Sequence, residues 1–297
     1  MKKINLSFIL LALAIGSFGQ SDPGLFSRLQ AISNHGVDFY NVDGIEITAQ
    51  KVDAEFTKKN ITKKYKQLAI REKELVVSDS LLEMQNYYVM KSKEEPAGLM
   101  NNLSYYFIES RDRKLIAFTF AMVNKTAKEF EREFIRLVYH EAIPRDVFNK
   151  VDPDSLNFAG RKIALDPSCH WMGINNMQCS HYGQMNWSVH KDPEDAKKTV
   201  ENQFRSINSG KRGRIISDTL VPVIFEGSET LARRAVFDFT GLSSALVGMS
   251  GGKSLTIYFV ATEVRNHYVS CVMSFWNNDQ VNPSGLSPLL EQVMRLK

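Results

Sequence analysis

Cysteine is scarce in this chain, with 3 among 297 residues. Three thiols allow at most one intramolecular disulfide and leave one thiol over. Cys169 and Cys179 lie in one expected loop, whereas Cys271 lies in an apolar stretch, where a free thiol behaves as a small hydrophobic side chain. We therefore expect a disulfide between Cys169 and Cys179, and a buried Cys271.

Long apolar runs are also missing, because no stretch approaches the roughly 20 residues that a membrane-spanning helix needs. The run from Ile4 to Ile15 is shorter; it follows Lys2 and Lys3 and precedes the small residues Gly16, Ser17 and Gly19. A basic start, an apolar middle and small residues before a cut are the parts of a secretory signal peptide. We expect residues 1–19 to be a signal peptide, and the protein to be exported, periplasmic or extracellular, and not membrane-spanning.

An excess of one charge is lacking as well. The chain has 37 basic and 33 acidic residues, a formal net charge of +4, and removal of Lys2 and Lys3 leaves +2. Nucleic-acid binding depends on a concentrated basic surface that neutralises phosphates. The sequence therefore predicts no nucleic-acid partner, and its 43% hydrophobic and 24% charged residues are typical of a globular protein.

Motifs of known catalytic chemistry are scarce too. The sequence has no His-Glu-x-x-His. The segment Gly248–Ser254 resembles a phosphate-binding loop, but the first glycine of that motif would fall at position 247, which is Val247. We therefore assign no catalytic residue, metal or cofactor, and whether the protein is an enzyme stays open, with a non-enzyme favoured.

The most informative feature present is an internal similarity. Residues 65–81 match residues 204–220 at a constant offset of 139, with ten of 17 positions identical or chemically close. The residues that we expect to be buried in the first copy, Ile61, Tyr65 and Leu68, have apolar counterparts 139 residues later, at positions 200, 204 and 207. This pattern predicts an internal duplication.

Each copy is predicted to run strand, helix, several antiparallel strands, helix. We expect an α+β fold of two tandem copies of this unit, each a mainly antiparallel sheet packed with helices. The first lobe spans 20–143, a linker spans 144–160, and the second lobe spans 161–297 with an insertion near 241–252. Expected elements include a strand at 75–78, a helix capped by Thr126, and a helix that begins at Asp192 and Pro193.

Reactive side chains are densest between residues 169 and 190. Two thiolates with His170 and His181 are the ligand types that zinc prefers. However, Cys169 and His170 are adjacent, whereas paired zinc ligands usually leave two or more residues between them. In an oxidising compartment the loop is better explained by a structural disulfide. A metal-dependent hydrolase that uses this loop, with His190, is the alternative.

These observations favour an exported, non-enzymatic binding or accessory protein of the cell envelope. Its partner, an unknown protein or small ligand, is expected in a groove between the lobes or under the 241–252 segment. The oligomeric state stays open. The residues that we consider candidate ligand contacts are His170, Trp171, His181, Trp187, His190, Leu242, Leu246 and Met249.

Overall fold

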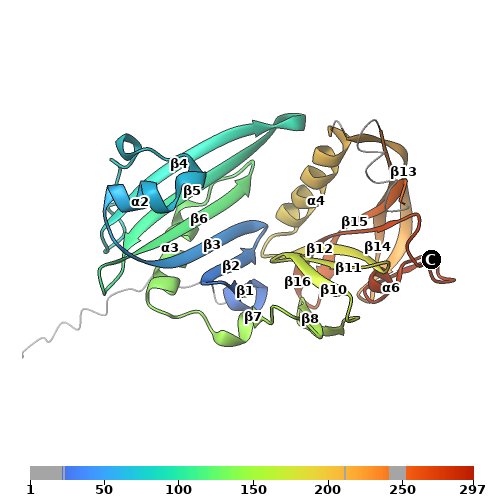
Figure 1. Ribbon diagram of the computed structural model, residues 1–297. Coiled ribbons are helices and arrows are strands. Elements are labelled where there is room, and N and C mark those ends of the chain that lie inside the picture. Colours follow the sequence, from blue (N-terminus) through green and yellow to red (C-terminus); the bar gives the residue numbers. More distant parts are fainter. Residues whose placement is uncertain (1–21, 23, 211, 241–251) are drawn as a thin grey trace, which may run out of the picture.

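The computed structural model describes residues 22, 24–210, 212–240 and 252–297 (Figure 1). Strands make up 49% of these residues and helices 21%. The expected α+β class, with two helix-packed units, is therefore wrong, because the molecule is mostly β and is built from large antiparallel sheets. None of the described helices is long and apolar enough to cross a membrane.

The first sheet has seven strands in the order β4-β5-β6-β3-β2-β1-β7. All neighbours are antiparallel except β7, which runs parallel to β1. The strands are β1 (Gln30–Asn34), β2 (Val37–Val42), β3 (Ile45–Glu55), β4 (Asn86–Glu95), β5 (Leu99–Glu109), β6 (Lys114–Val123) and β7 (Phe148–Asn149).

Alternate residues of a strand point to opposite sides of a sheet, so the first sheet presents side chains on two faces. Helices cover both of these faces. On one face, Phe134 of α3 (Lys128–Tyr139) packs with Phe120 and Tyr40. On the other, Ile61 and the neighbouring Tyr65 at the end of α2 pack in a separate core with alternate residues of β4, β5 and β6. Shorter helices are α1 (Leu25–Arg28), η1 (Lys66–Leu68), η2 (Glu72–Glu74), η3 (Pro96–Gly98) and η4 (Arg145–Val147), and α2 spans Lys58–Lys64.

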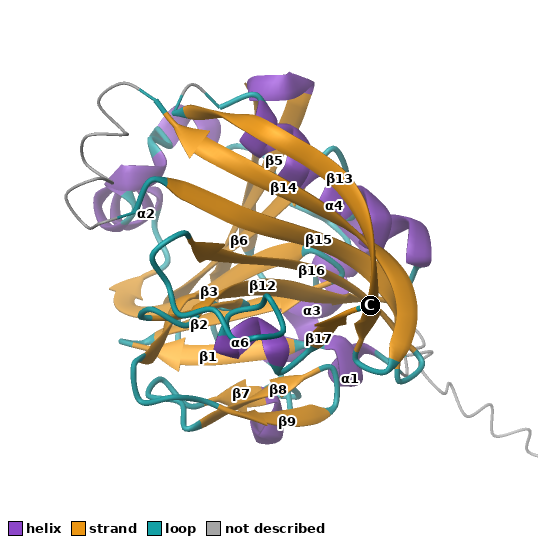
Figure 2. Ribbon diagram, turned by 90° about the vertical axis from the view of Figure 1, so that its right-hand side faces the viewer, coloured by secondary structure: helices purple, strands orange, loops and turns teal. Residues whose placement is uncertain are grey.

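The second sheet has eight strands in the order β10-β11-β12-β16-β15-β14-β13-β17, and β8 and β9 form a separate hairpin. Figure 2 shows the long strands β13, β14 and β15 bending together, so that the sheet curves like half of a barrel. The strands are β8 (Ser155–Phe158), β9 (Arg161–Ala164), β10 (Cys169–Gly173), β11 (Asn176–Cys179), β12 (Gly183–His190), β13 (Gly213–Phe225), β14 (Ser228–Phe239), β15 (Ser254–Val264), β16 (His267–Trp276) and β17 (Met294–Leu296).

Different elements cover the two faces of the second sheet. Phe204 of α4 (Pro193–Asn208) packs on one face, against Phe237 and Phe259. The β8–β9 hairpin and the four-residue α6 (Pro288–Glu291) pack on the other face, in the largest core of the molecule. The segment expected as a linker contains β7, which is a strand of the first sheet, and β8, which belongs to the hairpin packed on the second sheet.

The internal similarity has a mixed outcome. Tyr65 and Phe204 each pack against a sheet, as the matched positions predict. The strand expected at 75–78 is wrong, because Val76 and Val77 are 69% and 54% exposed and only the carbonyl of Val77 receives a hydrogen bond from β4, from Tyr88. The matching residues of the second copy lie within β13. The duplication itself stays a prediction.

The two expected helix starts also differ in outcome. Asp192 caps α4 as predicted, since its carboxylate accepts hydrogen bonds from the amides of Glu194 and Asp195. The predicted cap at Thr126 is wrong. The N-cap of α3 is Ala127, which has no capping side chain, so Thr126 lies one residue too early.

Candidate binding site between the two sheets

The turn between β2 and β3 joins the first sheet to the second. Asp43 and Gly44 both have positive φ, the geometry of the two-residue turn that Asp-Gly favours. The amide of Asp43 donates to the carbonyl of Val189 on β12 at 3.0 Å, and the Asp43 carboxylate accepts from the amide of Lys191 at 2.7 Å. The buried Arg28 also donates to this carboxylate, at 3.0 Å. One turn therefore fixes one sheet against the other.

Gly44 allows this close approach. A Cβ atom at this position would lie 3.1 Å from Oγ1 of Thr199 on α4 and 3.2 Å from Cε1 of His190 on β12. Both contacts are closer than ordinary packing permits, and the φ of +70° is itself unfavourable for residues other than glycine. The position therefore needs glycine for both its backbone and its surroundings.

A groove of about 330 Å³ lies between the sheets beside Gly44. Side-chain amides and hydroxyls from both sheets and from α4 dominate its lining. Hydrogen bonds span the gap that contains it: Lys125 donates to Asp195 at 3.0 Å, Asn124 donates to Asn202 at 3.4 Å, and Arg205 donates to the carbonyl of Ala97 at 2.5 Å. Its amide and hydroxyl residues are Asn41, Asn101, Asn175, Asn186, Ser188, Thr199, Asn202, Gln203 and Ser206.

Part of the groove lining is buried and lacks a hydrogen-bond partner. Asn41 is 2% exposed, and among the described residues its Oδ1 has no partner. Gln30 lies directly opposite Asn41 across β1 and β2, is 7% exposed, and has neither amide atom paired within the described chain. Buried polar groups are nearly always paired, and each unpaired one costs about 1–3 kcal/mol. Of these two residues Asn41 lines the groove and Gln30 does not, so the Oδ1 atom of Asn41 marks a place where a bound molecule can supply a missing hydrogen bond.

The opposite wall follows from the alternation of β12. Asn186, Ser188 and His190 share the face toward α4 and the first sheet, while the intervening residues enter the large core. Gln203 of α4 donates to Asn186 at 3.1 Å, and Asn175 donates to Ser188 at 3.0 Å. The amides of this wall are therefore held in place by one another.

A larger hollow of about 890 Å³ adjoins the same turn, and several of its charges are already paired. Lys191 lies 3.1 Å from the carboxylate of Asp22, and Lys125 pairs with Asp195. Burial tends to raise the pKa of Asp22, yet hydrogen bonds from Arg28, Gly24 and Lys191 lower it to about 2. Glu129 and Glu133 also line the hollow and form no ion pair among the described residues, so the charge that it leaves free for a ligand is negative.

His190 is the one sequence-predicted contact that lies at the joint. It is 1% exposed and lies against Gly44. Burial lowers its pKa to about 4, with opposing contributions from nearby Asp43 and Lys125. His190 is therefore neutral near pH 7, and its ring packs at the joint without lining the groove.

His190 and Ser270 resemble a catalytic base and nucleophile only in their spacing. Nε2 of His190 lies 2.7 Å from Oγ of Ser270. However, both side chains are buried, and in the described part of the chain Nδ1 of His190 has no partner that would orient the ring. Neither residue lines any of the five cavities described. The pair therefore lacks both the third group and the access that nucleophilic catalysis requires.

The predicted disulfide between Cys169 and Cys179 is confirmed, and Cys271 is buried and free. The bridge joins directly opposed residues of β10 and β11, beside a cavity of about 320 Å³. Because both thiols are consumed, this loop keeps no thiolate for a zinc ion. Groups of three or more metal-binding side chains are likewise absent from the residues described.

The other predicted contacts are dispersed. His170 and His181 are exposed, Trp171 donates its ring N–H to the carbonyl of Lys150 at 2.9 Å, and Trp187 is buried in the large core. The candidates of the 241–252 segment lie outside the described residues: Leu242, Leu246 and Met249. The sequence did not lead us to predict the residues of the groove, although the polar side chains at every second position of one strand, Asn186, Ser188 and His190, were a detectable signal.

Comparisons with known proteins give no identity. No protein family and no curated protein matches this sequence. Among solved structures, the chain is similar to the di-domain ARO/CYC StfQ from the steffimycin biosynthetic pathway, with 11% identity over 88% of this chain and 76% of that chain. The TM-score is 0.17, which is too low to carry an argument about fold or function. The function must therefore be argued from the geometry of the chain itself.

Proposed function

We propose that this protein is an exported, non-enzymatic binding protein of the cell envelope that holds a small, neutral, hydroxyl-rich ligand, such as a mono- or disaccharide, between its two sheets. The observation that carries this proposal is the unpaired amide oxygen of Asn41, buried in a groove lined by amides and hydroxyls. Inter-domain grooves are favoured binding places, and a few convergent polar groups give such sites their specificity.

The ligand class follows from the donors and acceptors. A side-chain amide donates through its nitrogen and accepts through its oxygen, and a sugar hydroxyl does both, so the two match. Three charged residues line the groove, Glu46, Glu95 and Lys125, and Lys125 is already paired with Asp195. A volume of about 330 Å³ is at the lower end for ligand pockets, which suits a small solute.

Export is supported by two features. The N-terminal pattern around Ile4–Ile15 fits a secretory signal, and the Cys169–Cys179 bridge fits an oxidising compartment, where disulfides persist. Cell fractionation with mass determination tests this: an exported protein that has lost about 19 residues supports the proposal, and a cytoplasmic protein of full length contradicts it.

Ligand binding is tested by thermal shift and calorimetry with a panel of mono- and disaccharides. The variant Asn41→Leu removes an amide that is unpaired without ligand, so its melting temperature should equal or exceed that of the parent. Its saccharide affinity should fall at least about tenfold, since one hydrogen bond to a buried ligand is lost.

Asn34→Leu is the matched control, because Asn34 is an exposed residue of the same hairpin that lines no described cavity. It should bind as the parent does. Equal affinity in Asn41→Leu and the parent, or no binding of any saccharide at millimolar concentration, would contradict the proposal. Binding of neutral dipeptide amides in place of saccharides would overturn the ligand class.

A further inference from the structure

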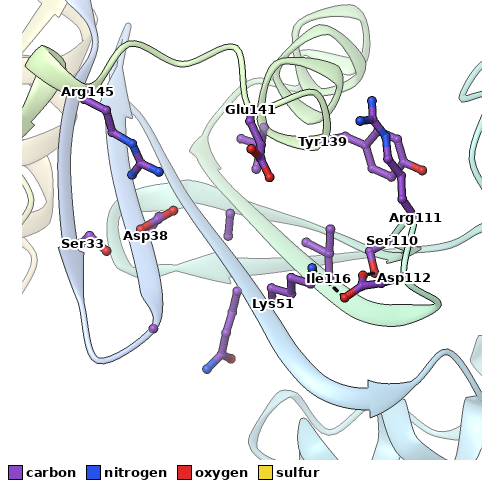
Figure 3. A pocket seen from close by; sticks show the side chains of 14 residues that line it. Ser33, Asp38, Lys51, Ser110, Arg111, Asp112, Ile116, Tyr139, Glu141 and Arg145 are labelled. Carbon is purple, nitrogen blue, oxygen red and sulfur yellow. Dashed lines mark hydrogen bonds and ion pairs between the residues drawn. The ribbon is translucent and has the colours of Figure 1, made fainter.

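A second cavity, of about 790 Å³, lies in the first sheet alone, beyond the C-terminal end of α3 (Figure 3). Its apolar floor includes Ala49 of β3 and Ile116 of β6, which are part of the core under α3. Tyr139 contributes from the last turn of the helix. The cavity is therefore a bowl with a sheet floor and a helix end as part of its wall, separate from the groove between the sheets.

Charged side chains of both signs line the bowl in equal number, three carboxylates and three cations. On one side two of the charges are paired: Lys51 lies 3.0 Å from Asp112, which also accepts a hydrogen bond from Ser110 at 2.6 Å. Arg111 on this side contacts His140 at 2.8 Å and lies over the ring of Tyr139. Arg111 is thus held in place but keeps its positive charge.

The other side carries charges without ion-pair partners. Within the described residues neither Arg145 nor Glu141 forms an ion pair, and Asp38 receives one hydrogen bond, from the hydroxyl of Tyr40 at 3.3 Å. Figure 3 shows Glu141 directed into the cavity from the segment after α3, with Arg145 and Asp38 facing each other across its edge. One cation and two carboxylates without ion-pair partners thus line this side of the cavity.

The position of Glu141 requires an unfavourable backbone. Its φ is +56°, a left-handed conformation that glycine adopts without cost and most other residues avoid. Hydrogen bonds from Glu141 to the carbonyl of Val138 and from Ala142 to that of Leu137 close the helix around it. Glycine or asparagine would suit this turn better. Glu141 therefore holds its carboxylate at the bowl at a cost in backbone free energy.

We propose that this bowl is a binding site for a small zwitterion, a free amino acid or short peptide. Its carboxylate pairs with the guanidinium of Arg145, and its ammonium lies between the carboxylates of Asp38 and Glu141. The C-terminal end of α3 carries partial negative charge, which favours the ammonium further. The neutral sum of the lining charges selects a ligand that carries both charges over one that carries a single charge.

The test uses isothermal titration of the full protein with free amino acids and unprotected dipeptides, compared with two single-charge analogues of each. An amino-acid amide keeps only the ammonium, and an N-acetyl amino acid keeps only the carboxylate. Each analogue should bind at least about tenfold more weakly than the zwitterion, because one charge-assisted contact is lost. Equal binding of either analogue, or no binding of any zwitterion at millimolar concentration, would overturn the proposal.

Glu141→Asn is the diagnostic variant, since asparagine tolerates the left-handed backbone while the charge is lost. It should raise the melting temperature of the free protein and weaken zwitterion binding at least about tenfold. Asp53→Asn is the control: it removes an exposed carboxylate of the same sheet that does not line the bowl, and it should bind normally. Unchanged affinity in Glu141→Asn would contradict the site. Asn41→Leu should leave zwitterion binding intact, which separates this proposal from the groove between the sheets.

Discussion

At the scale of single residues, His190 makes stability depend on pH. Burial lowers its pKa to about 4 from the ordinary value of 6.5. Between these values the unfolded chain binds a proton that the folded chain does not, so stability falls as the pH drops from 6.5 toward 4. From pH 7.5 to pH 5 this loss is about 2 kcal/mol.

Denaturant unfolding of the parent and of His190→Gln at both pH values measures this loss. Between pH 7.5 and pH 5, the free energy of unfolding of the variant is expected to fall by about 2 kcal/mol less than that of the parent, whatever the absolute stability of the variant. His35→Gln, at an exposed turn residue, is the control and should keep the pH dependence of the parent. Identical pH dependence in His190→Gln and the parent would show that His190 is not the titrating group.

Residue-level prediction from the sequence succeeded where chemistry was distinctive. The disulfide followed from the number and spacing of cysteines in a chain expected to be exported, and the burial of Cys271 followed from its apolar neighbours. The groove residues were missed because neutral amides such as Asn41, Asn175 and Asn186 form no motif. They lie in separate elements, and only the packing of two sheets brings them together.

At the scale of elements, a comparison of two glycines separates the stability cost of crowding between the sheets from the stability cost of the turn backbone. Gly36 and Gly44 each occupy the second position of a two-residue hairpin turn, with φ of +76° and +70°. A Cβ at Gly36 meets nothing within 4 Å, whereas one at Gly44 meets Thr199 and His190. Both alanine variants should lose about 1 kcal/mol of stability, because alanine fits the left-handed backbone less well than glycine. Gly44→Ala should lose at least about 1 kcal/mol more, because its new methyl group is too close to the neighbouring side chains.

Urea unfolding of the two variants checks the difference. Gly44→Ala should also weaken saccharide binding, because the groove beside it changes shape, while Gly36→Ala should not. Equal destabilisation by the two substitutions would mean that the sheets adjust freely at this joint, contrary to the close contacts of Gly44.

Element prediction was best where local signals agreed. The Asp192-Pro193 start of α4 was correct because capping and proline preferences act within a few residues. The helix content was overestimated because an amphipathic pattern does not set helix length: the chain end expected to be a helix forms the four-residue α6 and then β17. The strand expected at 75–78 failed because only the carbonyl of Val77 bonds to β4.

At the scale of the whole molecule, the α+β class was wrong for a reason beyond local sequence. Short helices and long strands have similar apolar spacing over a few residues, and only pairing across the sheet decides between them. Residues 213–225 pair with β14 along almost their whole length, which makes β13 one of the longest strands. Such long-range pairing leaves little trace in a single sequence.

The two sheets are joined mainly through the turn at Asp43, which predicts how the molecule unfolds. Asp43→Ala leaves the buried Arg28 with Asp22 as its remaining carboxylate and frees the amide of Lys191. Loss of one partner of a buried ion pair costs about 3 kcal/mol. Because this cost falls on the contact between the sheets, we expect calorimetry to show one unfolding transition for the parent and two for Asp43→Ala.

Asp53→Ala is the matched control, because Asp53 also pairs with a cation on the first sheet, Lys114, but at 90% exposure. An exposed, solvent-screened pair contributes little to stability, so this variant should unfold in one transition, close to the parent. If Asp43→Ala likewise unfolds in one transition with unchanged stability, the turn does not couple the sheets. In that case the backbone hydrogen bond from residue 43 to Val189, together with the bridges Lys125 to Asp195, Arg205 to Ala97 and Asn124 to Asn202, would have to hold the groove closed.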